Sequence, residues 1–155
     1  MSFRISGLPL APFEPLFGLP DEELRARGVR RVTADRTPGF PCRVSLQDAE
    51  VGETLLLLSY EHQPASSPYR SRHAIFVREG ATEAHPAPGE VPEVLRRRLL
   101  SVRAFDAEGM MIDADVVSGE ELEAVIESML LRPEALYLHL HNAKPGCYAA
   151  RVDRE

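Results

Sequence analysis

The order of strand-like and helix-like segments constrains the fold of this chain most. Short apolar or alternating segments, bounded by glycine and proline, come in runs, and three segments have helical character. Strict alternation of strands and helices builds a parallel sheet, whereas runs of strands favour antiparallel pairing. The sequence therefore predicts an α+β fold with a mainly antiparallel sheet, about six to eight strands and about three helices packed on it.

The expected elements can be placed by residue number. The segment ETLLLLSYEH, residues 53–62, is a short apolar run between turn signals, which predicts a central strand. No repeat or long linker divides the chain, so residues 1–155 are expected to form a single domain. Further strands are expected at 3–6, 29–34, 73–80, 100–106, 110–117, 135–142 and 147–153, and helices at 21–28, 92–98 and 119–131.

The helix at 119–131 has the clearest pattern. Ser118 and Glu121 form an S-x-x-E capping box before it. Its apolar positions fall on one stripe, which predicts a face buried against the sheet; they are Leu122, Val125, Ile126, Met129 and Leu130. In the strand that precedes it, alternation predicts a buried face made by Ile112, Ala114 and Val116.

Composition excludes several classes of function. The net charge is -6, which argues against nucleic-acid binding, because such proteins need a basic face for phosphates. No apolar run approaches the roughly 18 residues of a membrane helix, and the N-terminus lacks the layout of a secretion signal. The two cysteines are too few for a disulfide framework. We therefore expect a cytoplasmic protein with reduced thiols, no membrane contact and no nucleic-acid partner.

The stretch HLHNAKPGC, residues 139–147, gathers candidate reactive groups around one turn. Alternation puts Tyr137 on the same face of a strand as His139 and His141. The opposite face is expected to point to the core, and it carries Leu136, Leu138 and Leu140. An H-x-H pair can bind a metal, but nothing in the spacing selects a further ligand. We therefore predict solvent-facing or hydrogen-bonded histidines and assign no metal ligand.

The turn geometry decides where Cys147 points. If Pro145 and Gly146 form the centre of a type II turn, His141 lies opposite Ala150 and the thiol is buried on the leucine face. A three- or five-residue loop would put the thiol on the histidine face, where an imidazolium could activate it as a nucleophile. Both alternatives stay open, and the candidate catalytic residues are Cys147, His139 and His141.

Two polar loops supply candidate ligand-binding residues. The FPCR loop, residues 40–43, ends in an arginine whose planar fork suits a carboxylate or phosphate. The segment YEHQPASSPYR, residues 60–70, is a long loop of the kind in which binding residues concentrate. Together with the lysine of the hairpin turn, the candidates are Cys42, Arg43, Glu61, His62, Tyr69, Arg70 and Lys144.

Standard signatures of nucleotide-binding, hydrolase, metalloprotease and redox sites are absent from the sequence. The chain has no phosphate loop, dinucleotide fingerprint, nucleophile elbow, H-E-x-x-H or C-x-x-C. The sequence therefore identifies no cofactor.

Several long stretches resemble one bacterial family, the domain of unknown function family 1203. They include PGFPCRVSLQDAEVGE, LLLSYEHQPASSPYR, LRRRLLSVRAFDAEGMMIDADVV and HLHNAKPGCYAARVDR. The resemblance is spread over nearly the whole chain, which implies that the chain is the entire domain. It implies no activity, cofactor or catalytic residue, because the family has none assigned.

The leading hypothesis is a small-molecule-binding domain, and whether it is also an enzyme stays open. Its pocket would combine the FPCR loop, the YEHQPASSPYR loop and the HLHNAKPGC hairpin. The alternative is a non-catalytic interaction module or a homodimer formed through a sheet edge or a helix face. A metal-dependent enzyme is the third hypothesis.

Overall fold

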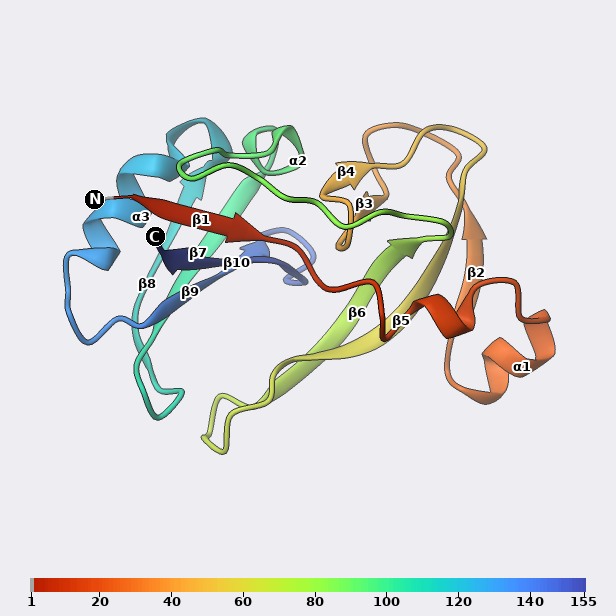
Figure 1. The fold of residues 1–155 in the computed structure, drawn as a ribbon, viewed down its shortest axis with the longest axis horizontal. Helices are drawn as coiled ribbons and strands as arrows, with labels where there is room; N and C mark the ends of the chain where they lie inside the picture. Colours follow the sequence, from red (N-terminus) through yellow and green to blue (C-terminus); the bar gives the residue numbers. More distant parts are fainter. Residues whose placement is uncertain (1) are drawn as a thin grey trace. The chain divides into compact units, whose positions relative to one another are not determined.

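The computed structural model describes residues 2–155 of the chain. Over that range the chain forms ten strands, three α-helices and two 3-10 helices (Figure 1), which confirms the α+β prediction. The strands exceed the expected six to eight because β3 (Pro41–Cys42) and β4 (Gln47–Asp48) are two-residue strands with too little pattern to detect. Pairing is mostly antiparallel, and the exception is the parallel contact of β3 with β6 (Ser71–Arg78).

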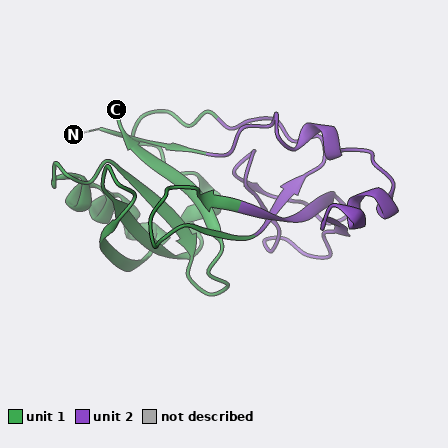
Figure 2. Ribbon diagram, turned by 90° about the horizontal axis from the view of Figure 1, so that it is seen from below, with its two compact units in different colours: residues 1–6, 61–73, 85–155 green, residues 7–60, 74–84 purple. Residues whose placement is uncertain are grey.

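The described residues cluster into two compact units (Figure 2). Unit 1 holds residues 2–6, 61–73 and 85–155, and unit 2 holds residues 7–60 and 74–84. That the chain forms a single domain stays a prediction.

Unit 2 is built on a five-stranded sheet of order β2-β5-β6-β3-β4. An apolar cluster lies against it, centred on Ala34, Ala49 and Leu55. Acidic residues open the first helix of this unit, where they suit the helix dipole, and Gly28 follows its end with a φ of 75°. The elements of unit 2 not yet bounded are η1 (Glu14–Leu16), α1 (Asp21–Ala26), β2 (Arg30–Thr33) and β5 (Thr54–Gln63).

Unit 1 is built on an antiparallel sheet of order β1-β10-β9-β7-β8. The ends of β5 and β6, residues 61–73, also belong to this unit. The elements of unit 1 are β1 (Phe3–Ser6), α2 (Glu93–Arg96), β7 (Leu99–Phe105), β8 (Met111–Ser118), η2 (Gly119–Glu121), α3 (Leu122–Leu130), β9 (Tyr137–Asn142) and β10 (Tyr148–Arg154).

One face of the unit 1 sheet is the core face. Ile5, Val152 and Leu138 lie opposite one another on neighbouring strands, and all three are fully buried. Helix α3 packs on β7 and β8 (Figure 1). Its buried residues are Leu122, Ile126, Met129 and Leu130, so the predicted stripe is confirmed at those positions.

The start of the helix differs from the predicted capping box. Ser118 Oγ accepts a hydrogen bond from Glu120 N at 3.4 Å, and a 3-10 turn precedes the α-helix. A Cβ added to Gly119 would lie only 1.9 Å from Leu95 O, so the first turn packs too closely on α2 for a side chain. Local sequence cannot reveal such a close tertiary approach.

Two burial predictions were wrong, one just before the inner strand β9 and one in the edge strand β8. Leu136 precedes β9 and is 47% exposed, whereas Leu138 and Leu140 are fully buried as expected. Val116 is 57% exposed and Ala114 is also exposed, because they lie opposite Ser101 and Arg103 on the face away from the core, whereas Val117 lies opposite Leu100 and is buried. Alternation separates the two faces of a strand, but in β8 it did not show which of them packs on the core.

The hairpin between β9 and β10 puts Cys147 on the leucine face, one of the two alternatives, but through a different turn. Asn142 N donates to Cys147 O at 2.9 Å and Gly146 N donates to Asn142 O at 2.8 Å, so four residues, 143–146, form the loop. A loop with an even number of residues keeps the same parity as the predicted two-residue turn. Cys147 therefore lies beside Asn142 on the leucine face, and its thiol accepts from Asn142 Nδ2 at 3.5 Å.

The pairing beyond that turn differs from the one expected for a type II turn. His141 lies opposite Tyr148, not Ala150, and the register shifts between Tyr148 and Ala150. This bulge inserts Ala149 into β10. Tyr148 and Arg151 consequently both point to the same face as the histidines.

Candidate functional site

The unit 1 sheet carries a row of basic side chains on the face opposite α3. In the strand register, Arg151 of β10 lies opposite His139 of β9, and Arg103 of β7 lies opposite His139 on its other side. Directly opposite residues of an antiparallel pair share a face. The three side chains therefore form one row across three neighbouring strands, and we call this side the histidine face.

A second row of the histidine face begins with Tyr148 and His141, which are also opposite one another. His62, near the end of β5, brings a third imidazole to them. Its ring centroid lies 4.9 Å from that of His141, and the His62 ring stacks on Tyr148 at 5.5 Å. The His62 and His139 centroids are 6.2 Å apart.

Hydrogen bonds hold residues 61–73 against this sheet. Gln63 Nε2 donates to Tyr137 Oη at 3.1 Å, and Ser67 Oγ donates to Gly109 O in the β7–β8 turn at 2.9 Å. Ser71 Oγ donates to Tyr69 O, so His62 Nε2 is the donor in its 3.0 Å contact with Ser71 Oγ. These contacts position His62 beside the histidine pair.

Aromatic rings surround His139. Its ring centroid is 5.0 Å from that of Phe105 and 5.2 Å from those of Tyr137 and Tyr148. Tyr69 reaches the same group and meets Phe105 edge-on at 6.3 Å. Apolar and aromatic walls of this kind exclude water and strengthen the electrostatic effect of any charge beside them.

The two sheet histidines have different hydrogen-bond environments. His141 Nδ1 donates to Gly146 O at 3.0 Å, since a carbonyl only accepts, and this contact leaves Nε2 as the acceptor nitrogen of a neutral ring. His139 is 3% exposed, and its buried Nδ1 has no hydrogen-bond partner among residues 2–155. A buried polar atom without a partner costs stability, so its presence calls for a functional explanation.

Burial lowers the pKa of both His139 and His141 to about 3. At His139 burial is the largest cause, and the neighbouring His141 and His62 and the cationic Arg151 and Arg103 contribute to the lowered pKa. The Gly146 carbonyl opposes the shift at His141, because it stabilises the protonated ring. Both imidazoles are consequently neutral at physiological pH and serve as hydrogen-bonding groups, not as cations.

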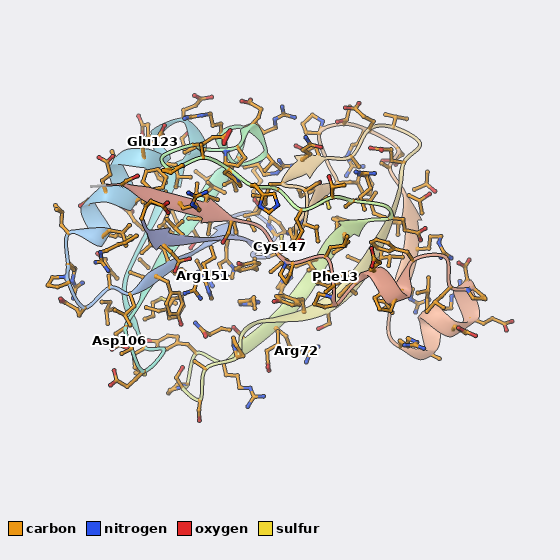
Figure 3. All side chains as sticks on the ribbon, viewed as in Figure 1. Phe13, Arg72, Asp106, Glu123, Cys147 and Arg151 are labelled. Atoms are coloured by element: carbon orange, nitrogen blue, oxygen red, sulfur yellow. The ribbon has the colours of Figure 1, made fainter. Side chains whose placement is uncertain are left out.

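The two arginines of the row differ in how their charge is balanced. Arg151 binds Asp153 in a bidentate ion pair at 2.9–3.1 Å, and its guanidinium lies 4.2 Å from the Tyr137 ring centroid. Arg103 Nε donates to Ser101 Oγ at 3.1 Å, and no carboxylate of the described chain pairs with Arg103. Burial lowers the pKa of Arg103, which marks a guanidinium partly removed from water without a counter-charge. Figure 3 shows the Arg151 side chain beside the sheet.

The candidate catalytic residues do not form one constellation. His139 and His141 share the histidine face, but Cys147 is 7% exposed and lies on the opposite face. The thiol is therefore not placed to be activated by either imidazole. Lys144 is exposed in the hairpin turn.

Among the candidates from the YEHQPASSPYR segment, His62 and Tyr69 join the aromatic group around His139. Glu61 and Arg70 instead pair with each other, with Arg70 Nε donating to Glu61 Oε2 at 3.0 Å. The Arg70 guanidinium lowers the pKa of Glu61 through this hydrogen bond. Their charges are mutually balanced at the surface, so neither adds net charge to the histidine face.

The FPCR candidates lie in unit 2. Cys42 is 1% exposed, and its thiol accepts from Ser45 N at 3.4 Å and from Arg78 N at 3.3 Å. Arg43 is also buried, and its Nη1 donates to Pro41 O at 2.5 Å. Both side chains are built into the interior of that unit.

Sequence reasoning missed the two arginines that flank His139, along with Phe105 and Tyr148. Arg103 and Arg151 are more than 30 residues apart, so no local motif joins them. A usable signal was the polar residue at every second position of the apolar LLSVRAF strand, where Ser101 and Arg103 stand on the side away from the core. The pairing partner, however, follows from tertiary structure alone.

Metal binding and membrane crossing were considered for residues 2–155 as well. No group of three or more histidine, cysteine, aspartate or glutamate side chains there is arranged to hold a metal ion. Within the same range, no helix is long and apolar enough to span a bilayer.

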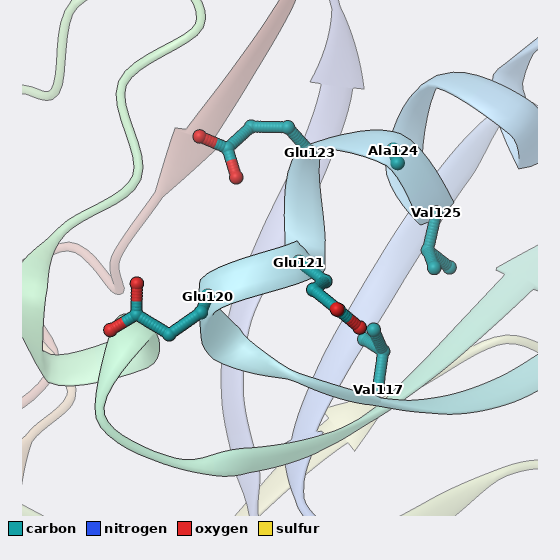
Figure 4. Close-up of a pocket in the computed structure, with 6 residues that line it drawn as sticks. All are labelled: Val117, Glu120, Glu121, Glu123, Ala124 and Val125. Atoms are coloured by element: carbon teal, nitrogen blue, oxygen red, sulfur yellow. The ribbon is translucent and has the colours of Figure 1, made fainter.

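A hollow of about 490 Å³ lies in unit 1 between the end of β8 and the start of α3 (Figure 4). Glutamates dominate its lining, and Glu123 is paired with Arg96 at 2.5 Å. The hollow is open, and no buried polar group of the described residues is aimed into it, so the histidine face remains the stronger candidate. The lining residues are Val117, Glu120, Glu121, Glu123, Ala124 and Val125.

Comparison with known proteins gives one match. A family model described as "Protein of unknown function (DUF1203)" matches residues 39–154. No curated protein and no solved structure matches the chain.

Proposed function

The chain belongs to the DUF1203 family, and from that premise we propose that it binds a small molecule on the histidine face of unit 1. The observation that carries the proposal is the buried Nδ1 of His139, which has no hydrogen-bond partner in residues 2–155. A ligand that hydrogen-bonds to this nitrogen would relieve the cost of leaving it unsatisfied.

The surroundings of His139 have the composition of a small-molecule site. Such sites are mostly apolar or aromatic, with a few fixed polar groups that orient the ligand. Phe105 and Tyr137 supply the aromatic wall, while His141 and Arg103 supply directed polar groups. The imidazoles act as neutral hydrogen-bond partners, so the proposal requires binding and does not require acid–base catalysis.

The rival hypothesis of a sheet-edge homodimer has less support. Side chains already bind outer backbone groups of the edge strand β8. Asp113 accepts from Ala114 N at 2.9 Å, Asp115 accepts from Val116 N at 2.8 Å, and Arg132 donates to Ile112 O at 3.0 Å. These side chains compete with strand pairing by a second copy.

Binding can be tested with four probes of defined chemistry: phenol, benzamide, benzoate and inorganic phosphate. Histidine ring ¹H–¹⁵N spectra would be recorded while each probe is titrated at constant ionic strength. We expect at least one probe to shift the His139 and His141 signals saturably. The signal of the exposed His85 serves as the internal control and should not move.

Two variants make the test specific. His139→Phe fills the same space and removes both nitrogens, and His141→Asn keeps a polar group; each should weaken binding of the responding probe. His85→Asn is the matched control and should leave binding unchanged. If no probe shifts either buried histidine in the folded wild-type protein, the binding proposal is wrong.

A further inference from the structure

Two arginines lie beside His139, and within residues 2–155 one of them has a carboxylate partner while the other has none. This difference bears on the chemistry of the ligand. Arg103 and Arg151 stand two strands apart, on either side of His139, and strand spacing puts their backbones about 10 Å apart. Long arginine side chains from both positions can reach one group bound between them. Asp153 balances one of these charges through its ion pair with Arg151.

The remaining charge belongs to Arg103. Its one hydrogen bond within residues 2–155 goes to the neutral hydroxyl of Ser101, and no carboxylate there pairs with it. The cations that act on His139 are Arg151 and Arg103, because the neighbouring ring of His141 is neutral. This face is therefore locally positive, although the chain as a whole has a net charge of -6.

An arginine partly withdrawn from water without a counter-charge costs stability unless an anion joins it. Its planar fork of N–H groups matches two oxygens of a carboxylate or phosphate. The neutral ring of His139 lies in the same row and can donate or accept one further hydrogen bond through Nδ1.

We infer that the ligand of the histidine face carries an oxyanion group, a carboxylate or a phosphate, which binds Arg103 beside His139. This inference rests on the proposed binding function and adds the chemical class of the ligand. The Phe105 and Tyr137 rings stack at 5.5 Å on the same side of the sheet, so an oxyanion attached to a flat ring or an apolar body suits the neighbouring surface. Arg151 contributes positive charge but keeps its geometry through Asp153 and Tyr137.

The sharpest test compares benzoate with benzamide, because the two have nearly the same shape and differ in charge. Dissociation constants would be measured from the His139 and His141 shifts at constant ionic strength, with chloride as the balancing anion. We expect benzoate to bind at least about tenfold more tightly than benzamide, the effect of one charge-assisted hydrogen bond. Inorganic phosphate identifies the source of the oxyanion: tighter binding of phosphate indicates a phosphorylated ligand, and tighter binding of benzoate indicates a carboxylate.

Variants of Arg103 assign the effect to a residue. Arg103→Gln should remove the preference for benzoate over benzamide, and Arg103→Lys, which keeps the charge but loses the fork, should retain part of it. Arg97→Gln is the matched control, because Arg97 caps the C-terminal end of α2 and pairs with Glu93 at 3.8 Å. Circular dichroism of each variant confirms that it is folded.

The outcomes separate this inference from the binding proposal. If benzamide binds as tightly as benzoate and Arg103→Gln changes neither, the oxyanion inference is overturned while small-molecule binding stands. If the anions bind equally well to Arg103→Gln and wild type, Arg103 is not the recognition residue and the inference also fails. If no probe shifts the buried histidines, both proposals fail together.

Discussion

His139 and His141 should remain neutral far below the usual titration range of histidine. Burial lowers both pKa values to about 3, whereas an imidazole in the unfolded chain titrates near 6.5. Between those values the unfolded state binds protons that the folded state excludes, so stability is fully present above pH ~6.5 and falls as pH decreases toward 3. Each histidine should cost about 1.4 kcal/mol of unfolding free energy per pH unit in that window.

This pH dependence can be measured by urea unfolding at a series of pH values. Replacing His139 with Phe should reduce the slope between pH 6 and 4 by about one proton, whereas His85→Asn, at an exposed position, should leave the slope intact. An imidazole titration by NMR that placed either buried histidine near pH 6.5 would contradict the burial argument.

The two thiols should be unreactive in the folded protein. Cys42 and Cys147 are buried, and each accepts a hydrogen bond from a neighbouring N–H group. Iodoacetamide labelling followed by mass spectrometry should show slow modification of both in buffer and rapid modification in concentrated urea. A fast native reaction at Cys147 would restore the nucleophile hypothesis, because the thiolate and not the thiol is the reactive form.

At the scale of elements, β8 is protected against pairing with another strand by its own aspartates. Asp113 and Asp115 accept hydrogen bonds from the N–H groups of Ala114 and Val116 at the outer edge. Replacing both aspartates with alanine frees these groups and removes two charges from an edge that exposes Val116. We expect the double variant to self-associate in a concentration-dependent way.

Sedimentation velocity over a range of protein concentrations measures that association. A double variant with Glu108→Ala and Glu127→Ala makes the same change in net charge at exposed positions outside β8, and it should stay in the wild-type state. Equal association of both double variants would indicate a general charge effect and would contradict edge protection.

At the scale of the whole chain, the first and last strands are partners in one sheet. Ile5 of β1 lies opposite Val152 of β10, and both are fully buried. Ile5→Ala should therefore lower the unfolding free energy by about 2–5 kcal/mol, and Ile5→Val by about 0.5–1.5 kcal/mol. Urea unfolding followed by far-UV circular dichroism gives both values, and a negligible loss in Ile5→Ala would show that β1 is not part of the cooperative core.

Local periodicity was sufficient to predict most elements and the faces of several. The stripe on α3 and the alternation of His139 and His141 with Leu138 and Leu140 follow from helix and strand geometry within a few residues. The burial of Leu136 and Val116 was predicted wrongly, because Leu136 precedes its strand and Val116 lies on the face away from the core.

The candidate site was predicted in part. The sequence identified the imidazoles of His62, His139 and His141, because a histidine is a candidate functional residue wherever it occurs in a sequence. It also suggested Cys42, Arg43 and Cys147, which the structure buries within the units. It missed Arg103 and Arg151, because an arginine in a mostly apolar strand is informative only when its neighbours across the sheet are known.

The sequence by itself determined which segments of this protein become strands and helices, and which side of β9 carries imidazoles, because these properties repeat over two to four residues. Tertiary structure alone decided that His62 meets His141, that a bulge at Ala149 turns Tyr148 and Arg151 to the histidine face, and that Arg103 lacks a carboxylate partner. The physical reason is that strand register is set by hydrogen bonds and packing between segments distant in the chain. Those contacts place the charges around His139, and no local pattern encodes them.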